Sequence, residues 1–243
     1  SDQPMKLLSI NILIGIIISL ICFGLYRLTG DTVQWVAFGI GIYFLTCWIQ
    51  GLKSRDPVTF EMIFKTKSFL LIVIGFPFIS FITYSMAAFG PSFYMRNYGI
   101  TEAEVATILG LITAFSGSIG VIGGGIIADK LRKKYTNGRL YVGLAVVVFG
   151  VPAALAFLYA DNLYASYVYY SIFQLITPMW VGIAPATVSD LVLPRMRGLA
   201  SAFYLLVVSM IGLALGPYCI GKLSDVYQST GYSSGEALRA ALS

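Results

Sequence analysis

The chain has 243 residues, of which 58% are hydrophobic and 11% charged, and its mean hydropathy is +0.83. A soluble domain carries about 25% charged residues, so this composition excludes a disordered chain, a fibre and almost any soluble fold. The absence of histidine excludes histidine-based zinc sites and general bases, and the three cysteines lie in apolar runs that exclude a disulfide framework. No metal, cofactor or nucleic-acid partner is expected, and the net charge of +5 reflects topology.

Seven uncharged apolar runs divide the chain, each bounded by charged residues. A helix of about 20 residues crosses the roughly 30 Å hydrocarbon core and satisfies its own backbone hydrogen bonds there. The sequence therefore predicts an all-α polytopic membrane protein. The predicted spans are Leu7–Tyr26, Thr32–Leu52, Ser68–Met95, Val105–Ala128, Leu140–Ala160, Asn162–Ser189 and Gly198–Gly221.

Prolines interrupt the two longest runs, at Pro77 and Pro91 in the third and at Pro178 and Pro185 in the sixth. Because proline removes a backbone hydrogen bond, these positions predict kinks around a cavity. Membrane helices also tolerate proline without such a role, so this alternative stays open.

The basic residues predict the orientation of the spans. If the N-terminus lies inside, the inner loops hold most of the lysines and arginines, as cytoplasmic loops do. The loops 53–67 and 129–139 are therefore expected to be cytoplasmic, in what we expect to be a bacterial inner (plasma) membrane. Phe60, Ile63 and Phe64 predict that the first of these loops forms an amphipathic helix on the membrane surface.

Similar short segments precede the first and seventh runs: Ser1-Asp2 with Met5-Lys6, and Ser189-Asp190 with Met196-Arg197. Such a repeat is typical of transporters built from two similar halves. Residues 235–242 predict the start of a further helix. We therefore expect helices five to eleven of twelve and the beginning of the twelfth. On this interpretation residues 1–52 end the first half, 53–67 link the halves, and 68–243 form a second half whose last helix is truncated.

The fourth run ends in a glycine, three further residues, an aspartate and several basic residues. This pattern resembles the signature loop of the major facilitator superfamily, and Arg132 in place of the second glycine is typical of its weaker second-half copy. Gly125 and Asp129 share one helix face, so Gly125 is expected to admit a neighbouring helix. Asp129 is expected to pair with a basic residue or to cap the next helix. A plain basic loop after a glycine-rich helix is the alternative. The predicted gating set is Gly125, Asp129, Lys130, Arg132, Lys133, Arg195 and Arg197.

Two later segments, Pro194–Arg197 and Gly212–Pro217, resemble the spinster-like branch of that superfamily. The resemblance implies a major facilitator fold and a secondary transporter that works by alternating access. It also implies an amphipathic or organic anion as substrate, similar to a lysolipid or a sphingoid phosphate. A carrier of drugs, sugar acids or other small metabolites is the main alternative within the transporter class.

The interiors of the spans carry almost no charge, so uncharged polar and aromatic side chains are the candidates for lining a substrate path. Ordinary hydrogen bonding between helices is the alternative for each of them. Arg96 could grip an anionic head group with two hydrogen bonds, or could extend to the membrane surface as an anchor. The candidate substrate-binding residues are Tyr84, Phe93, Arg96, Thr113, Ser116, Gln174, Trp180 and Tyr204.

Two other classes of protein fit the sequence less well. Seven spans suggest a receptor or a light-driven pump, but the charge bias puts the N-terminus inside, and Lys222 lies at the edge of its span. A membrane enzyme would need a general base or a metal set, and no span carries one. We therefore expect a monomeric transporter, not an enzyme, whose partners are the lipid bilayer and a small-molecule or lipid substrate. Coupling to protons is left open, because any titrating carboxylate would lie outside these spans.

Overall fold

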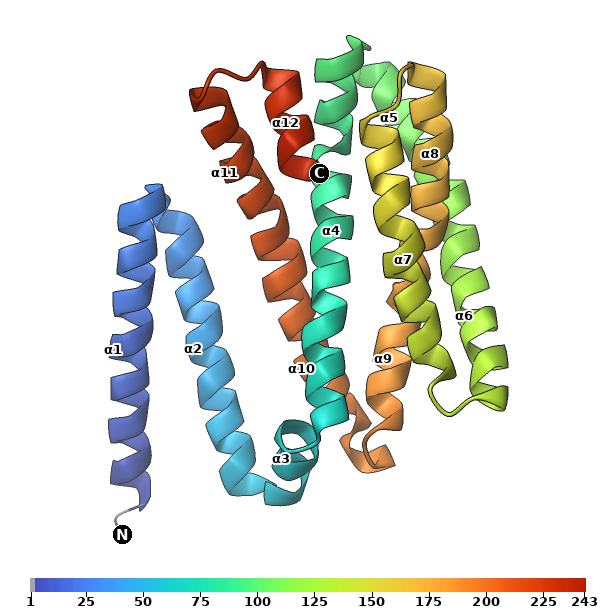
Figure 1. Cartoon of the computed structure of the whole chain (residues 1–243). Helices are drawn as coiled ribbons and strands as arrows, with labels where there is room; N and C mark the ends of the chain where they lie inside the picture. Colours follow the sequence, from blue (N-terminus) through green and yellow to red (C-terminus); the bar gives the residue numbers. More distant parts are fainter. Residues whose placement is uncertain (1–2) are drawn as a thin grey trace. The chain divides into compact units, whose positions relative to one another are not determined.

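The computed structural model describes residues 3–243, which form helices joined by short connections (Figure 1). Within these residues there is no strand, and seven helical segments are long and apolar enough to cross a membrane. The predicted fold class and the seven predicted spans are confirmed. The backbone contacts divide the chain into two units, residues 1–67 and 68–243, and each unit is described by itself.

The first unit is a pair of long helices followed by a short one. Gly30 turns the chain between the two long helices with φ of +79°, a conformation that glycine adopts without strain. Trp35 Nε1 donates to Thr29 Oγ1 over 2.6 Å and fastens this turn. The bounds are α1 (Gln3–Thr29), α2 (Thr32–Arg55) and α3 (Pro57–Phe64).

Helix α3 confirms that a helix forms within residues 53–67. The Asp56 carboxylate accepts a hydrogen bond from the Thr59 backbone N–H at 3.1 Å, and Pro57 occupies the first turn, where its missing N–H costs nothing. Whether this helix lies on the membrane surface stays a prediction.

The second unit is a bundle of long helices, several of which contain a local change of helix type (Figure 1). Its elements are α4 (Lys67–Tyr98), α5 (Glu102–Ile112), η1 (Thr113–Gly117), α6 (Ser118–Lys134), α7 (Gly138–Leu158), α8 (Leu163–Ile176), η2 (Thr177–Met179), α9 (Trp180–Asp190), η3 (Pro194–Met196), α10 (Arg197–Val208), η4 (Ser209–Leu215), α11 (Gly216–Ser229) and α12 (Ser234–Leu242).

The prolines act differently in the two longest spans. Helix α4 stays α-helical through both Pro77 and Pro91, whereas the sixth span changes to a 3₁₀ turn, η2, around Pro178. The sequence did not predict the π-helical segments η1 and η4. Segments of this kind insert an extra residue into a helix and are frequent at functional sites.

An aromatic core joins α4, α7 and α8 near one end of this unit. Tyr94, Phe157 and Tyr170 are buried, and the rings of Phe157 and Tyr170 are 5.3 Å apart. The Ser166 hydroxyl lies 2.9 Å from both Tyr94 Oη and the Phe157 carbonyl oxygen. This satisfied polar pair fixes the relative register of three helices inside an otherwise apolar core.

Glycines on α6 allow a close approach to the sixth span. A Cβ atom on Gly120 would lie 2.2 Å from the Leu175 carbonyl oxygen, and one on Gly124 would lie 2.6 Å from Met179 Cβ. A Cβ on Gly125 would meet nothing within 4 Å. Within the second unit, contrary to the prediction, the residues that admit a neighbouring helix are Gly120 and Gly124 and not Gly125. Gly120 and Gly124 are four residues apart on the face turned to α8 and η2, and Gly125 points about 100° away from that face.

Candidate functional site

Four charged side chains converge where α6, α7 and α9 come together at one end of the bundle. Arg132 Nη1 of α6 lies 2.9 Å from Asp190 Oδ2 of α9. Arg139 of α7 bridges both acids, with Nη2 3.0 Å from Asp129 Oδ1 and Nη1 in contact with Asp190 Oδ2. We call Asp129, Arg132, Arg139 and Asp190 the charge cluster.

The charge cluster is partly shielded from solvent. The side chains of Arg139 and Asp190 are 15% and 28% exposed, whereas both members of the Lys65–Glu61 pair are largely exposed. A partly desolvated ion pair is screened less by water and salt than an exposed one. The Arg139–Asp190 pair therefore ties α7 to α9 more firmly than a surface pair would, whereas Arg132 and Asp129 of α6 are 48% and 66% exposed.

Sequence reasoning found only part of the charge cluster. The expected pairing of Asp129 with a basic residue is confirmed, and the partner is Arg139. Arg139 and Asp190 were not in the predicted gating set, although each stands next to the end of a predicted span. The only sequence feature that could have identified Arg139 and Asp190 is their position at the end of a span. Their distance along the chain does not indicate that they pair.

The other basic residues of the predicted gating set lie outside the charge cluster. Lys130, Lys133 and Arg195 are exposed. Arg197 donates from Nε to the Ser189 carbonyl oxygen over 3.1 Å, beside Asp190. The charge cluster thus connects helices within the second unit.

Three of the predicted substrate-binding residues form an aromatic group from three helices. The ring centroids of Tyr84 (α4) and Trp180 (α9) are 6.4 Å apart and the rings are nearly perpendicular, and the Tyr204 phenol (α10) lies in the neighbourhood of Tyr84. Trp180 is 4% exposed and Tyr204 is 1% exposed. Within the described residues, Trp180 Nε1 and Tyr204 Oη are buried without a hydrogen-bond partner. A buried unpaired donor is costly, so these two atoms are suited to an acceptor that the helices do not supply.

A second polar group joins α8 to the π-helical segment η1. Gln174 Nε2 donates to Thr113 Oγ1 over 2.7 Å, and the Tyr170 hydroxyl lies beside Thr113. Ser116 lies three residues further along η1 and is half-buried. Two predicted residues, Thr113 and Gln174, are therefore in direct contact, and Tyr170 joins them without having been predicted.

The last two predicted residues lie nearer the end of α4. Phe93 is fully buried in the aromatic core, where the Arg239 guanidinium of α12 lies 5.9 Å from its ring centroid. Arg239 also donates to Asn97 Oδ1 over 3.0 Å. Arg96 is exposed. Because Phe93 follows Tyr84 by nine residues, it lies about 13 Å further along the helix, so the structure does not bring it into the aromatic group.

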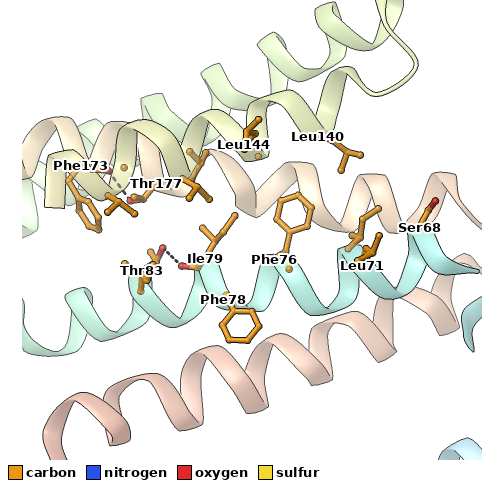
Figure 2. Close-up of a pocket in the computed structure, with 18 residues that line it drawn as sticks. Ser68, Leu71, Phe76, Phe78, Ile79, Thr83, Leu140, Leu144, Phe173 and Thr177 are labelled. Atoms are coloured by element: carbon orange, nitrogen blue, oxygen red, sulfur yellow. Dashed lines mark hydrogen bonds between the residues drawn. The ribbon is translucent and has the colours of Figure 1, made fainter. Parts of the chain in front are cut away.

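An apolar pocket of about 470 Å³ lies between α4 and α7 (Figure 2). Phe76 and Ile79 point into it from α4, and Leu140 and Leu144 from α7. Two of its hydroxyl groups are occupied by their own helices: Thr83 Oγ1 donates to the Ile79 carbonyl oxygen over 2.9 Å, and Thr177 Oγ1 to the Phe173 carbonyl oxygen over 2.8 Å. None of the predicted substrate-binding residues lines this pocket, and most of its lining is apolar.

The described residues contain no group of three or more cysteine, aspartate or glutamate side chains placed to hold a metal ion. In the second unit the charge cluster, the aromatic group and the Thr113–Gln174 pair are three groups that contain predicted site residues.

Comparison with known proteins identifies relatives by sequence and by fold, although no family model matches. The chain is 32% identical over 192 residues to an MFS-type efflux pump of Mycolicibacterium smegmatis, covering 74% of this chain and 44% of the pump. It is 30% identical over 200 residues to protein spinster homolog 1 of Xenopus tropicalis, covering 75% and 36%. The chain thus spans less than half the length of these curated relatives.

The comparison of folds also identifies spinster-like transporters as relatives. The structure matches that of a bacterial homolog of the human lysosomal transporter Spinster, in an inward-facing and occupied conformation. The TM-score is 0.62 at 21% identity, over 87% of this chain and 53% of the homolog. The same homolog in its inward-facing, unoccupied conformation also gives 0.62. With the predicted motif and the seven spans, these matches show that the chain belongs to the spinster-like branch of the major facilitator superfamily.

Proposed function

We propose that the protein is a secondary transporter that moves an amphipathic or organic anion, similar to a lysolipid or a sphingoid phosphate, across the membrane by alternating access. The relatives are named as an efflux pump and as spinster proteins, which are transport proteins and not enzymes. The structural relatives are described in occupied and unoccupied inward-facing conformations, which supports a binding site that opens to one side.

The observation that carries the proposal is the pair of buried donors in the aromatic group. Trp180 Nε1 and Tyr204 Oη have no partner within the described residues, as is also true of buried polar atoms of Ser85, Tyr167 and Arg239; of these five, only these two belong to the aromatic group. An amphipathic substrate offers both an apolar body for the rings and oxygen acceptors for the two donors. The Thr113–Gln174 pair and the half-buried Ser116 add further uncharged polar groups from η1 and α8.

Uptake into proteoliposomes tests the proposal. Purified protein is reconstituted, and accumulation of a radiolabelled lysophospholipid is compared with that of its zwitterionic and uncharged analogues. We expect protein-dependent uptake that prefers the anion, and a raised KM in Arg96→Ala if that guanidinium meets the anionic head group. Uptake equal to that of protein-free vesicles would overturn the lipid substrate.

Efflux of other small molecules is the second candidate, because one relative carries the name of an efflux pump. Competition in the same vesicles separates the two: a drug or metabolite substrate would be accumulated without competition from the lysophospholipid. Proton coupling is tested there as well, by imposing a pH gradient. The acidic residues of this chain lie at or near the ends of its spans, so we propose that any coupling carboxylate lies outside them.

We propose that the charge cluster contributes to gating by holding α6, α7 and α9 together as one body. Alternating access requires each bundle to move as a unit, and shared carboxylates at the helix ends resist movement of one helix against another. The cytoplasmic position of this end, and the span order five to twelve, stay predictions.

A further inference from the structure

One face of α6 is left uncovered by the rest of the second unit. Ile119, Ile122 and Ile126 are each more than half exposed. They follow one another at spacings of three and four residues, so they form a single stripe along the helix. An exposed isoleucine stripe within a membrane-spanning helix is suited to contact with acyl chains.

Three lysines continue this stripe at the end of the helix. Lys130, Lys133 and Lys134 repeat the same spacing from Ile126 and are all exposed. Lys134 Nζ lies 5.3 Å from the centroid of the Tyr135 ring, an aromatic group of the kind found at membrane interfaces. Arg132 lies on the opposite side of the helix, where it contacts Asp190. We call Lys130, Lys133 and Lys134 the lysine patch.

The lysine patch is not neutralised by the protein that surrounds it. The nearby acids Asp129 and Asp190 are already paired with Arg139 and Arg132. Within residues 3–243 the structure gives none of the three lysines an acidic partner within 4.0 Å. Three uncompensated positive charges therefore stand at the end of an apolar stripe.

We propose that this face of α6 binds an anionic phospholipid, with the headgroup phosphate on the lysine patch and the acyl chains along Ile119, Ile122 and Ile126. Lysine binds phosphate as a compact point charge, and a lysine near an anionic leaflet adds about 1 kcal/mol to membrane binding. Along α6 the apolar stripe is followed by the lysine patch, just as the acyl chains of a phospholipid are followed by its headgroup. The inference is independent of what the protein transports.

Charge favours a lipid over residues 1–67 as the occupant of this face. Those residues carry six basic and four acidic side chains, so they are themselves net positive and do not complement three lysines. An anionic headgroup does complement them. Occupation by the first unit of the chain is therefore the alternative outcome of the test.

Native mass spectrometry of the purified full chain measures this binding directly. Phosphatidylglycerol and phosphatidylcholine are added separately, and the dissociation constant of the first bound lipid is determined for each. We expect phosphatidylglycerol to bind more tightly than phosphatidylcholine, and the triple variant Lys130→Gln, Lys133→Gln, Lys134→Gln to weaken only the phosphatidylglycerol, about tenfold or more.

Two further variants keep the result interpretable. The arginine triple variant at the same positions should retain phosphatidylglycerol binding, since it preserves the charge. The charge-matched control Lys53→Gln, Arg55→Gln, Lys67→Gln should change it by less than about twofold. Three results would each overturn the proposal. The first is equal weakening of phosphatidylglycerol binding in the control and the lysine-patch variants. The others are unaltered phosphatidylglycerol binding in the lysine-patch variant and equal affinity for the two lipids. In the last two cases the first unit of the chain is the better candidate for this face.

Discussion

Arg132 of α6 and Asp190 of α9 form an ion pair of 2.9 Å between helices that α7, α8 and η2 separate along the chain. Arg139 of α7 contacts the same carboxylate oxygen, so one acid holds two other helices. This geometry gives Asp190 more influence on the helix ends than any other acid of the second unit that the structure describes.

Replacing Asp190 with asparagine should therefore destabilise the protein. Two ion pairs are lost and the partly shielded Arg139 loses its closest anion, so we expect a loss of about 1 to 2 kcal/mol, between the values for exposed and buried pairs. The fall in melting temperature in detergent measures it. The control Glu61→Gln removes the exposed pair with Lys65 and should cost no more than about 0.5 kcal/mol. Equal melting temperatures for the two variants would rule out a special role for Asp190.

The close contact of α6 with the sixth span predicts a glycine requirement. In Gly120→Ala the new methyl group would stand 2.2 Å from the Leu175 carbonyl oxygen, a rigid backbone atom, so the helices must separate. We expect a loss of about 1 to 3 kcal/mol from overpacking. Gly123→Ala is the matched control on the same helix, because its Cβ would meet nothing within 4 Å, and it should be neutral or slightly stabilising. The melting temperatures of both variants test this prediction. An unchanged melting temperature in Gly120→Ala would contradict the close contact between the helices.

Removal of the unpaired Tyr204 hydroxyl distinguishes a role in substrate binding from a role in stability. Tyr204→Phe removes a buried donor that has no partner in the described residues, so stability should be kept or should rise by up to about 1 kcal/mol. Substrate affinity should fall at least severalfold, because the donor that meets the substrate is gone. The comparison is Tyr94→Phe, which loses the contact with Ser166 and should lower the melting temperature. Unchanged transport kinetics in Tyr204→Phe would exclude this hydroxyl from the site.

The Thr113–Gln174 hydrogen bond predicts an energetic coupling between η1 and α8. In a double-mutant cycle of Thr113→Val and Gln174→Leu, we expect an interaction energy of about 0.5 to 1.5 kcal/mol, as for hydrogen bonds between membrane helices. Unfolding in a detergent and denaturant series provides the four free energies. Additive effects of the two substitutions would mean that the pair contributes no coupling.

Some features of the fold follow from the sequence because they depend on local physics. Apolar length predicts the seven spans, and the polar linker with Phe60, Ile63 and Phe64 predicts α3. Polar residues inside apolar runs predict that Thr113 and Gln174 face other groups and not lipid. These inferences need only the hydropathy and the spacing of nearby residues.

Other features depend on which helices pack together, and the sequence does not contain that information in a readable form. Arg139 and Asp190 are 51 positions apart, so their pairing requires the bundle itself. The sequence does not show which of Gly120 and Gly125 lies at a helix contact. Only the structure shows that Gly120 is on the face of α6 that packs against α8. The π-helical segment η4 likewise lies against a helix distant in the chain: a Cβ on Gly212 would lie 2.1 Å from Ser80 Oγ of α4.

Alternating access is the central claim, and the separation of the two units tests it most directly. Spin labels are placed at Ser54→Cys in the first unit and Thr136→Cys in the second, both exposed positions, after Cys22, Cys47 and Cys219 are replaced by serine. Double electron–electron resonance in nanodiscs then gives the distribution of distances with and without lysophospholipid. Alternating access predicts two distance populations whose ratio shifts when the substrate is added. A single distance that stays the same with substrate would contradict it.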